Sequence, residues 1–273
     1  MNAPAVPARS IIVPCYNEER NLEELVRRTL RAVSRHRIAA ELVLIDDGSE
    51  DGTRESIKTA ARRHEEVRGC YHDDNRGIAE AWKTGVAASR APVVLITDAD
   101  LQYAPEDIPR LYQRLVEGDS DLVQGWRSGR DVQDGYRSAL SGAFSLLLNR
   151  LFGTRLRDIK SGFLCTRRDT FAALLETRYR YRRLQHFIVV NAAKGFRIRQ
   201  EPVGFGKRRA GRSFIRSPIW FGLTSFTDLP RAFWEFRVVT AGGRPADVRD
   251  RRHLRRGRHP IDDPAPRPSR SGR

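Results

Sequence analysis

The sequence predicts an α/β protein whose central sheet is mostly parallel and is flanked by helices. Short apolar runs without polar alternation, at residues 10–13, 41–45 and 92–96, are typical of strands buried on both faces, as in parallel sheets. Between these runs, apolar residues recur at helical spacing. Strands that alternate with helices in this way favour a doubly wound sheet.

The first half of the chain keeps this order throughout. After the strand at 10–13, an apolar stripe over residues 22–33 predicts a helix that Asn17 can cap. Beyond the strand at 41–45, a polar helix should follow Thr53. Further strands are expected at 67–71 and 122–125, and further helices at 77–89 and 108–116.

The second half is richer in basic and aromatic residues. An apolar helix is expected at 139–152, a helix from about Asp169, a helix around 184–193 and a strand at 196–203. Residues 204–213 form a basic, glycine-rich loop suited to closing over an anion.

Four segments are expected along the chain: an N-terminal tail at 1–8, one catalytic-sized domain at 9–214, an amphipathic segment at 215–240 and a basic tail at 241–273. The third segment interleaves aromatic residues with arginines, which suits either a membrane interface or a helix pair packed on the body. The last is dominated by Pro, Arg and Gly without periodicity, which predicts disorder.

Composition limits the setting of the protein. The 273 residues carry a formal net charge of +16, so an anionic partner is expected. The three cysteines, Cys15, Cys70 and Cys165, have neither metal spacing nor a disulfide pattern, which favours a reducing cytoplasm. We see no signal peptide, and no stretch reaches the roughly 18 apolar residues of a membrane span. Any membrane contact is therefore expected to be peripheral.

Acidic residues follow several of the predicted strands. Asp98 and Asp100 come directly after the strand at 92–96, while Glu18 and the pair Asp46 and Asp47 follow the two earlier strands. The carboxyl ends of strands are where open α/β sheets place ligands. Two close carboxylates repel each other unless a cation lies between them, and a hard divalent ion that also holds phosphates suits this position. No dinucleotide-binding or P-loop glycine motif is present.

These motifs resemble those of the family 2 glycosyltransferases with the GT-A fold. The resemblance rests on residues 13–19 (VPCYNEE), 45–53 (IDDGSEDGT) and 98–102 (DADLQ). Later features are similar to the polyprenyl-phosphate hexosyltransferases, which include dolichyl-phosphate mannosyltransferase. They are Arg127, Arg137 with Ser141, Asp158 followed by residues 161–163 (SGF), and the basic glycine loop, which here has Phe214 where the family usually has lysine.

The resemblance implies a donor site and an acceptor site. Nucleotide-sugar contacts would come from Pro14, Tyr16, Glu18, Asp46, Asp47, Asp98 and Ala99. Asp98, Asp100 and Gln102 would bind Mg²⁺ or Mn²⁺ with the diphosphate. The acceptor phosphate would be held by Arg127, Arg137, Ser141, Arg208 and Ser213, and Asp158 would orient a substrate near the reacting carbon. Asp100, Asp158 and Arg127 are the expected catalytic residues.

The resemblance thus predicts transfer of mannose or glucose from GDP-mannose or UDP-glucose to a polyprenyl phosphate. A phosphate acceptor is already nucleophilic, and the sequence offers no convincing covalent nucleophile, so one inverting displacement is expected. The expected location is the cytoplasmic face of the membrane, where a separate anchoring protein is a plausible partner. Two alternatives remain open, namely a polysaccharide or protein acceptor and a non-catalytic anion-binding protein. No nucleic-acid module is recognisable, so no nucleic-acid partner is expected.

Overall fold

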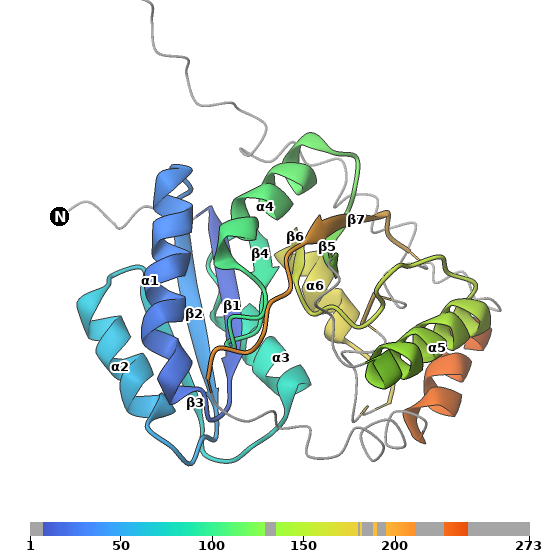
Figure 1. Ribbon diagram of the computed structural model, residues 1–273, viewed down its shortest axis with the longest axis horizontal. Helices are drawn as coiled ribbons and strands as arrows, with labels where there is room; N and C mark the ends of the chain where they lie inside the picture. The colour runs from blue at the N-terminus through green and yellow to red at the C-terminus, as the bar shows by residue number, and fades with distance from the viewer. Residues whose placement is uncertain are drawn as a thin grey trace, which may run out of the picture.

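The computed structural model describes residues 8–128, 135–179, 181, 188–189, 195–210 and 227–239, with residues 135–141 described by their backbone alone. Seven strands form one sheet in the order β3-β2-β1-β4-β6-β5-β7 (Figure 1). They are β1 (Arg9–Cys15), β2 (Ala40–Asp47), β3 (Val67–His72), β4 (Val93–Ile96), β5 (Leu122–Arg127), β6 (Leu164–Arg167) and β7 (Ile198–Val203). All neighbours pair in parallel except β6, which runs antiparallel to β4 and β5. The predicted α/β class with a mostly parallel sheet is confirmed.

Helices connect the strands and cover the sheet. They are α1 (Glu19–Arg35), α2 (Thr53–Arg63), α3 (Ile78–Ala88), α4 (Ile108–Glu117) after a 3₁₀ turn at Pro105–Asp107, α5 (Gly135–Phe152) and α6 (Arg168–Leu175). A last helix spans residues 227–239 and is π-helical over Trp234–Val239. In the described part of the chain, no helix combines the length and apolar character needed to cross a membrane.

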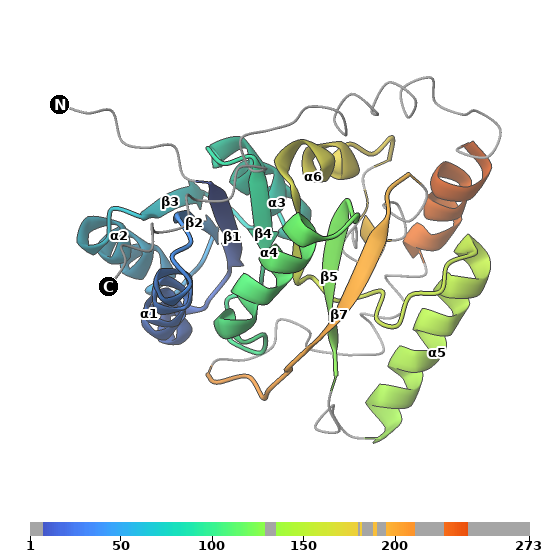
Figure 2. The same cartoon turned by 90° about the horizontal axis from the view of Figure 1, so that it is seen from above.

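Helices lie on both faces of the sheet (Figure 2). Alternating residues of the central strands build an apolar layer on each face. Along β1, Ile11 and Val13 belong to one layer and Ile12 to the other, as the two-residue period of a strand requires. The first layer includes Leu22, Leu25, Ile57, Ile108 and Leu111 from α1, α2 and α4. The second includes Trp82, Leu148, Phe152, Phe171 and Phe236 from α3, α5, α6 and the last helix. Burial on both faces explains why these strands are continuously apolar.

The last helix packs beside α5 at one end of the molecule (Figure 2). The ring centroids of Phe152 and Phe233 lie 6.2 Å apart, and the Arg237 guanidinium donates to the Phe152 carbonyl over 3.4 Å. Ala232 and Phe236 of this helix are buried, and the Phe236 ring stacks on Tyr181, whereas Trp234 stays 53% exposed. This part of the amphipathic segment therefore packs on the body, and it also keeps an exposed aromatic side chain. Residues 215–226, most of the helix expected at 184–193, and both tails lie outside the described residues.

Strand direction decides which loops meet. The carboxyl ends of β1, β2, β4, β5 and β7 share one edge of the sheet because these strands are all parallel. Since β6 is antiparallel, the loop that precedes it, at residues 158–163, arrives at the same edge. The sequence analysis did not predict β6, and so it did not predict that the loop at residues 158–163 lies at this edge.

Gly85 of α3 tests how closely this helix packs on the sheet, and Gly142 of α5 serves as its control. A Cβ on Gly85 would lie 2.4 Å from Cγ2 of Ile12 and 3.1 Å from Cδ1 of Ile45, whereas a Cβ on Gly142 of α5 would meet nothing within 4 Å. We expect Gly85→Ala to lower the free energy of unfolding by about 1–3 kcal/mol through overpacking. The control, Gly142→Ala, should raise it by roughly 0.5–1 kcal/mol because alanine favours the helix. Urea denaturation measures both, and equal effects would contradict this view of the α3 contact.

Candidate active site

The turn after β4 carries the two aspartates singled out by the sequence. Leu101 adopts a left-handed conformation with φ of 61°, and the backbone N–H of Gln102 donates to Oδ1 of Asp100 over 3.0 Å. Within the described residues, no hydrogen bond reaches Asp98. A Cβ placed on Gly162 would lie 3.8 Å from Oδ1 of Asp98, so the loop before β6 lies next to this carboxylate. The turn fixes Asp100 and leaves Asp98 facing the neighbouring loop.

Glu18 and Asp100 share a hydrogen-bonding partner, the guanidinium of Arg208. The Arg208 guanidinium donates to Oε1 of Glu18 over 2.7 Å and to Oδ2 of Asp100 over 3.0 Å. Nδ2 of Asn21 donates to Oε2 of Glu18 over 2.6 Å. The loop after β7 therefore reaches the ends of both β1 and β4, as its basic composition suggested.

Burial and neighbouring negative charge raise the pKa of two of these carboxyl groups, Asp98 and Glu18. Burial is the main cause that raises the pKa of Asp98, and the charge of Asp100 raises it further, against the opposing effect of Arg208. Burial also raises the pKa of Glu18, although Arg208 and Asn21 oppose the change. Added positive charge would therefore be favoured at this edge.

The donor chemistry fits a hard divalent cation that shares its ligands with a substrate. In the described ranges, no group of three His, Cys, Asp or Glu side chains is arranged to hold a metal by itself. Asp98 and Asp100 supply two carboxylates, and magnesium sites commonly use one or two carboxylates together with phosphate oxygens and water. The residues present therefore fit a metal–diphosphate pair better than a metal bound by protein alone.

Gln102 ties this turn to the basic loop. Its Nε2 donates to the Gly206 carbonyl over 3.1 Å, and the Gly206 N–H donates to the Gln102 carbonyl over 2.9 Å. Gln102, which the sequence analysis expected to bind the metal, thus uses its amide nitrogen to hold the loop, and its Oε1 is the atom that could act as a ligand.

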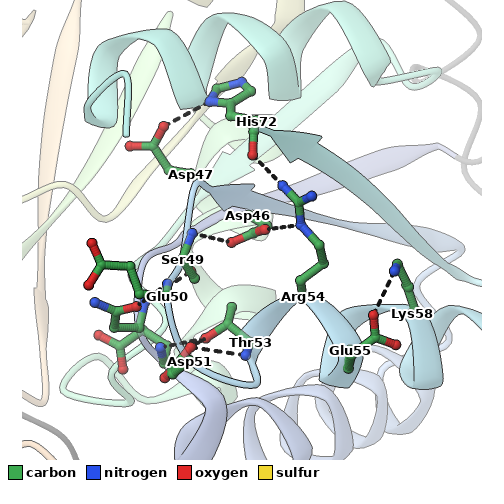
Figure 3. A network of polar contacts seen from close by, with 12 residues as sticks. Asp46, Asp47, Ser49, Glu50, Asp51, Thr53, Arg54, Glu55, Lys58 and His72 are labelled. Carbon is green, nitrogen blue, oxygen red and sulfur yellow. Dashed lines mark hydrogen bonds and ion pairs between the residues drawn. The ribbon is translucent and has the colours of Figure 1, made fainter. Parts of the chain in front are cut away.

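Asp46 is fully buried and is occupied by protein donors (Figure 3). The Ser49 N–H donates to its Oδ1 over 3.0 Å, and Nε of Arg54 donates to its Oδ2 over 2.8 Å. The Arg54 guanidinium also donates to the His72 carbonyl and thereby joins α2 to β3. A carboxylate with no exposed surface stabilises this loop, and direct contact with a nucleoside would need the loop to open.

Asp47 is likewise used inside the protein (Figure 3). Its Oδ1 lies 2.8 Å from Nδ1 of His72, whose Nε2 lies 2.9 Å from Oγ1 of Thr84. The N–H groups of Arg76 and Gly77 donate to the same carboxylate over 3.0 and 2.9 Å. Sequence reasoning missed His72 and Arg54, since neither lies in a recognisable motif.

Hydrogen bonds join the loops after β1 and β2. The N–H of Asn17 donates to Oγ of Ser49 over 3.0 Å, and Oδ1 of Asn17 accepts from the Glu50 N–H over 2.9 Å. The Glu18 N–H donates to Oγ1 of Thr53 over 2.8 Å. The expectation that Asn17 caps α1 is wrong, because Glu18 occupies the N-cap position and makes no side-chain cap bond.

The remaining residues expected at the donor site lie along the same edge. Pro14 and Tyr16 are half-buried at the end of β1, and Ala99 is buried between the two aspartates. All three are thus available to shape the site, and none has a charge of its own.

Arg127 and Asp158 form the second charged centre of this edge. Nε and Nη2 of Arg127 donate to the two Asp158 oxygens over 2.6 and 2.9 Å, which is a bidentate pair. The Arg127 guanidinium carbon also lies 5.1 Å from the centre of the Phe205 ring. Burial raises the pKa of Asp158, but the hydrogen bonds and charge of Arg127 outweigh it, so the pKa is lowered overall. Arg127 was expected to face a phosphate, and Asp158 takes two of its donors.

Tyr103 connects the loops of the two centres. Its hydroxyl donates to Oγ of Ser161 over 2.9 Å, and its ring centre lies 5.2 Å from that of Phe163. Its backbone forms an antiparallel bridge with Phe205. One buried side chain therefore contacts the loops after β4, before β6 and after β7. The sequence analysis did not single out Tyr103.

Three expected acceptor residues have no described side chain. Arg137 and Ser141 lie in the first turns of α5, where only the backbone is described, and Ser213 lies outside the described residues.

The ion pair of Arg127 with Asp158 predicts a pH-dependent stability. Asp158→Asn should lower the free energy of unfolding by about 2–4 kcal/mol near pH 7, because it leaves the half-buried Arg127 without its carboxylate partner. Since the pKa of Asp158 is lowered on folding, this stabilisation exists above the ordinary aspartate pKa of about 4 and is lost as the pH falls through the folded value. Urea unfolding of both proteins from pH 7 to 2.5 should therefore show a difference that is constant down to about pH 4 and shrinks below it.

Asp119→Asn is the matched control, because the Asp119 side chain is 99% exposed and pairs with Arg197 at 3.5 Å. It should change little at any pH. A loss at Asp158 that stays constant with pH would contradict the ion-pair explanation.

Comparison with known proteins identifies the family of the chain. The model of the family described as glycosyl transferase family 2 matches residues 10–179. An undecaprenyl-phosphate 4-deoxy-4-formamido-L-arabinose transferase from Pseudomonas aeruginosa is 37% identical over 172 residues, which cover 63% of this chain and 50% of that protein. A dolichol-phosphate mannosyltransferase from Pyrococcus furiosus is 29% identical over 219 residues, or 78% of this chain and 60% of that protein. The chain thus spans about half the length of the first of these relatives.

Solved structures share the fold. Glucosyl-3-phosphoglycerate synthase from Mycobacterium tuberculosis, in complex with Mn²⁺, uridine diphosphate and glucosyl-3-phosphoglycerate, matches with a TM-score of 0.62 and 19% identity. The match covers 84% of this chain and 80% of that one. This likeness confirms the predicted GT-A fold. Together with the family match over residues 10–179, it shows that the chain belongs to glycosyl transferase family 2.

Proposed function

We propose that the protein transfers a hexose, mannose or glucose, from a nucleotide sugar to a polyprenyl phosphate in one inverting displacement. The observation that carries this proposal is the acidic turn of Asp98 and Asp100 at the carboxyl end of β4, with Arg208 bound to it and the Arg127–Asp158 pair on the same edge of the sheet. Family membership and the polyprenyl-phosphate transferases among the relatives support the class of reaction.

On the donor side, Pro14, Tyr16 and Glu18 would line the nucleoside position, while Asp46 and Asp47 hold the loop that shapes it. Asp98 and Asp100, with Oε1 of Gln102, would hold Mg²⁺ or Mn²⁺ against the diphosphate. When bound, such an ion supplies Lewis-acid stabilisation of the charge on the departing diphosphate. These residues bind and orient the donor.

On the acceptor side, positioning matters more than proton transfer, because a phosphate monoester is already nucleophilic at neutral pH. Asp158 accepts from Nε and Nη2 of Arg127, so the acceptor phosphate would be bound through Nη1. Arg137 and Ser141, at the start of α5, would complete the phosphate site. Two arginines near one phosphate give charge-assisted hydrogen bonds that fix its orientation toward the sugar.

A lipid acceptor agrees with the outer surface of α5 and the last helix. Leu146 is 69%, Trp234 53% and Val238 38% exposed, and Arg231 and Arg237 are exposed on the same pair of helices. Exposed apolar side chains beside arginines suit the interface of an anionic membrane, where each basic residue contributes about 1 kcal/mol. This surface supports the proposal that the protein acts as a peripheral enzyme at a membrane, and we propose the inner face as its location.

The direct test combines purified protein, Mg²⁺ or Mn²⁺, a short polyprenyl phosphate and a panel of UDP- and GDP-sugars, with product separated by thin-layer chromatography. One donor should give a lipid-linked hexose. Asp100→Asn should reduce transfer to background because the metal that would hold the diphosphate loses one of its carboxylate ligands. Nucleotide binding with transfer only to a polysaccharide or protein acceptor would contradict the lipid acceptor. A folded protein that binds no nucleotide sugar would contradict the donor site.

Arg137 tests the acceptor site separately. Arg137→Ala should raise the KM for polyprenyl phosphate about tenfold to a hundredfold, the range expected for losing a hydrogen bond to a charged group. The Kd for the nucleotide sugar should stay unchanged. Arg150→Ala, in the last turn of the same helix, is the control and should change neither. Equal losses in donor and acceptor binding would show that the acceptor site lies elsewhere.

A further inference from the structure

The guanidinium of Arg208 occupies the place where the donor site needs positive charge. It lies 2.7 Å from Glu18 and 3.0 Å from Asp100, and the side chains of these two acids are each only 9% exposed. Arg208 itself is 21% exposed. Two largely buried carboxylates therefore share one cation that comes from a loop remote in sequence.

The loop that carries Arg208 is bound to the donor site on both sides of this residue. Before it, Gly206 forms the reciprocal pair with Gln102, and Phe205 bridges to Tyr103. After it, Nδ2 of Asn21 donates to the Ala210 carbonyl over 3.2 Å, and the same nitrogen donates to Glu18. These contacts hold the Arg208 side chain over the carboxylates.

A divalent cation would compete with Arg208 for the same oxygen atoms. Buried carboxylates close to each other are costly without a counter-charge, and Arg208 compensates part of this cost. A divalent metal ligated by Asp100 would bring two positive charges next to the Arg208 guanidinium. Repulsion between the metal and the guanidinium would then outweigh the attraction of the guanidinium to Asp100. The diphosphate that accompanies the metal would in turn offer new anionic oxygens.

We propose that Arg208 is an exchangeable counter-cation of the donor site: it neutralises Glu18 and Asp100 when the site is empty and passes to the anionic diphosphate when metal and donor bind. This inference rests on the proposed function. It moves Arg208 from the acceptor site, where the family resemblance placed it, to the donor site. The loop would then close over the donor through a charge that is already positioned there.

The adjacent Arg209 provides a matched control. It has the same charge and belongs to the same loop, but it pairs with Glu24 on the surface at 2.9 Å, with 54% of its side chain exposed. Any effect of loop charge as such should appear equally at both positions.

The experiment measures Mn²⁺ binding without nucleotide, by electron paramagnetic resonance, and UDP and GDP binding at saturating Mn²⁺, by calorimetry. Arg208→Gln should bind Mn²⁺ alone about tenfold more tightly, because the competing cation is gone, and should bind the nucleoside diphosphate about tenfold more weakly, within the usual range of coupling between sites. Arg208→Lys should lie between wild type and Arg208→Gln in both measurements. Arg209→Gln should match wild type.

The exchange predicts that Arg208→Gln binds Mn²⁺ more tightly and the nucleoside diphosphate more weakly. If Arg208 had only a structural role, its loss would weaken the binding of both ligands. Unchanged Mn²⁺ affinity in Arg208→Gln, or parallel weakening of both ligands, would overturn the proposal, with thermal unfolding confirming that the variant is folded. If wild type and all variants bind neither Mn²⁺ nor any nucleotide, the donor site of the proposed function fails, and the counter-cation role fails with it.

Discussion

Burial of negative charge at one edge of the sheet is the constraint on which the rest of the structure depends. Five carboxylates there are buried, and each has partners from a different part of the chain. Their residues are Glu18, Asp46, Asp47, Asp100 and Asp158. Arg208 serves Glu18 and Asp100, Arg54 serves Asp46, and Arg127 serves Asp158. Because an unpaired buried carboxylate is costly, these pairings require β1, β2, β4 and the later loops to assemble together.

The acidic residues at this edge differ in how many hydrogen bonds their carboxylates accept from the protein. Asp46 and Asp47 are saturated by arginine, histidine and backbone donors, so their charges serve the loop that follows β2. Asp98 has no hydrogen bond from the described residues, and its pKa is raised by burial and by Asp100. Within the protein, the charges of Arg208 and Arg127 oppose this rise. Asp46 and Asp47 are thus held by direct hydrogen bonds, whereas Asp98 interacts with the arginines only through their charge.

Sequence reasoning succeeded where the signal is local. Runs such as residues 92–96 identify buried strands because a strand covered on both faces has no polar position. It failed for β6, whose residues Leu164–Arg167 are few and end in a threonine and an exposed arginine, a pattern without a clear period. The acids of the site were found from motifs, but Arg54, His72 and Tyr103 were not, because their contacts join residues 8 to 58 positions apart and nothing local marks them.

The missed strand is also what brings the two halves of the site together. If β6 ran parallel to its neighbours, the loop carrying Asp158 would lie at the opposite edge of the sheet, away from Asp98. Its antiparallel direction places Asp158 within bonding distance of Arg127 at the end of β5, and it places Ser161 under Tyr103 from the turn after β4. The loop after β7 then contacts both groups, through Phe205 beside Arg127 and through Arg208 on Asp100. A single reversal in the sheet thus explains why the two charged centres, around Asp98 and Asp100 and around Arg127 and Asp158, meet on one edge.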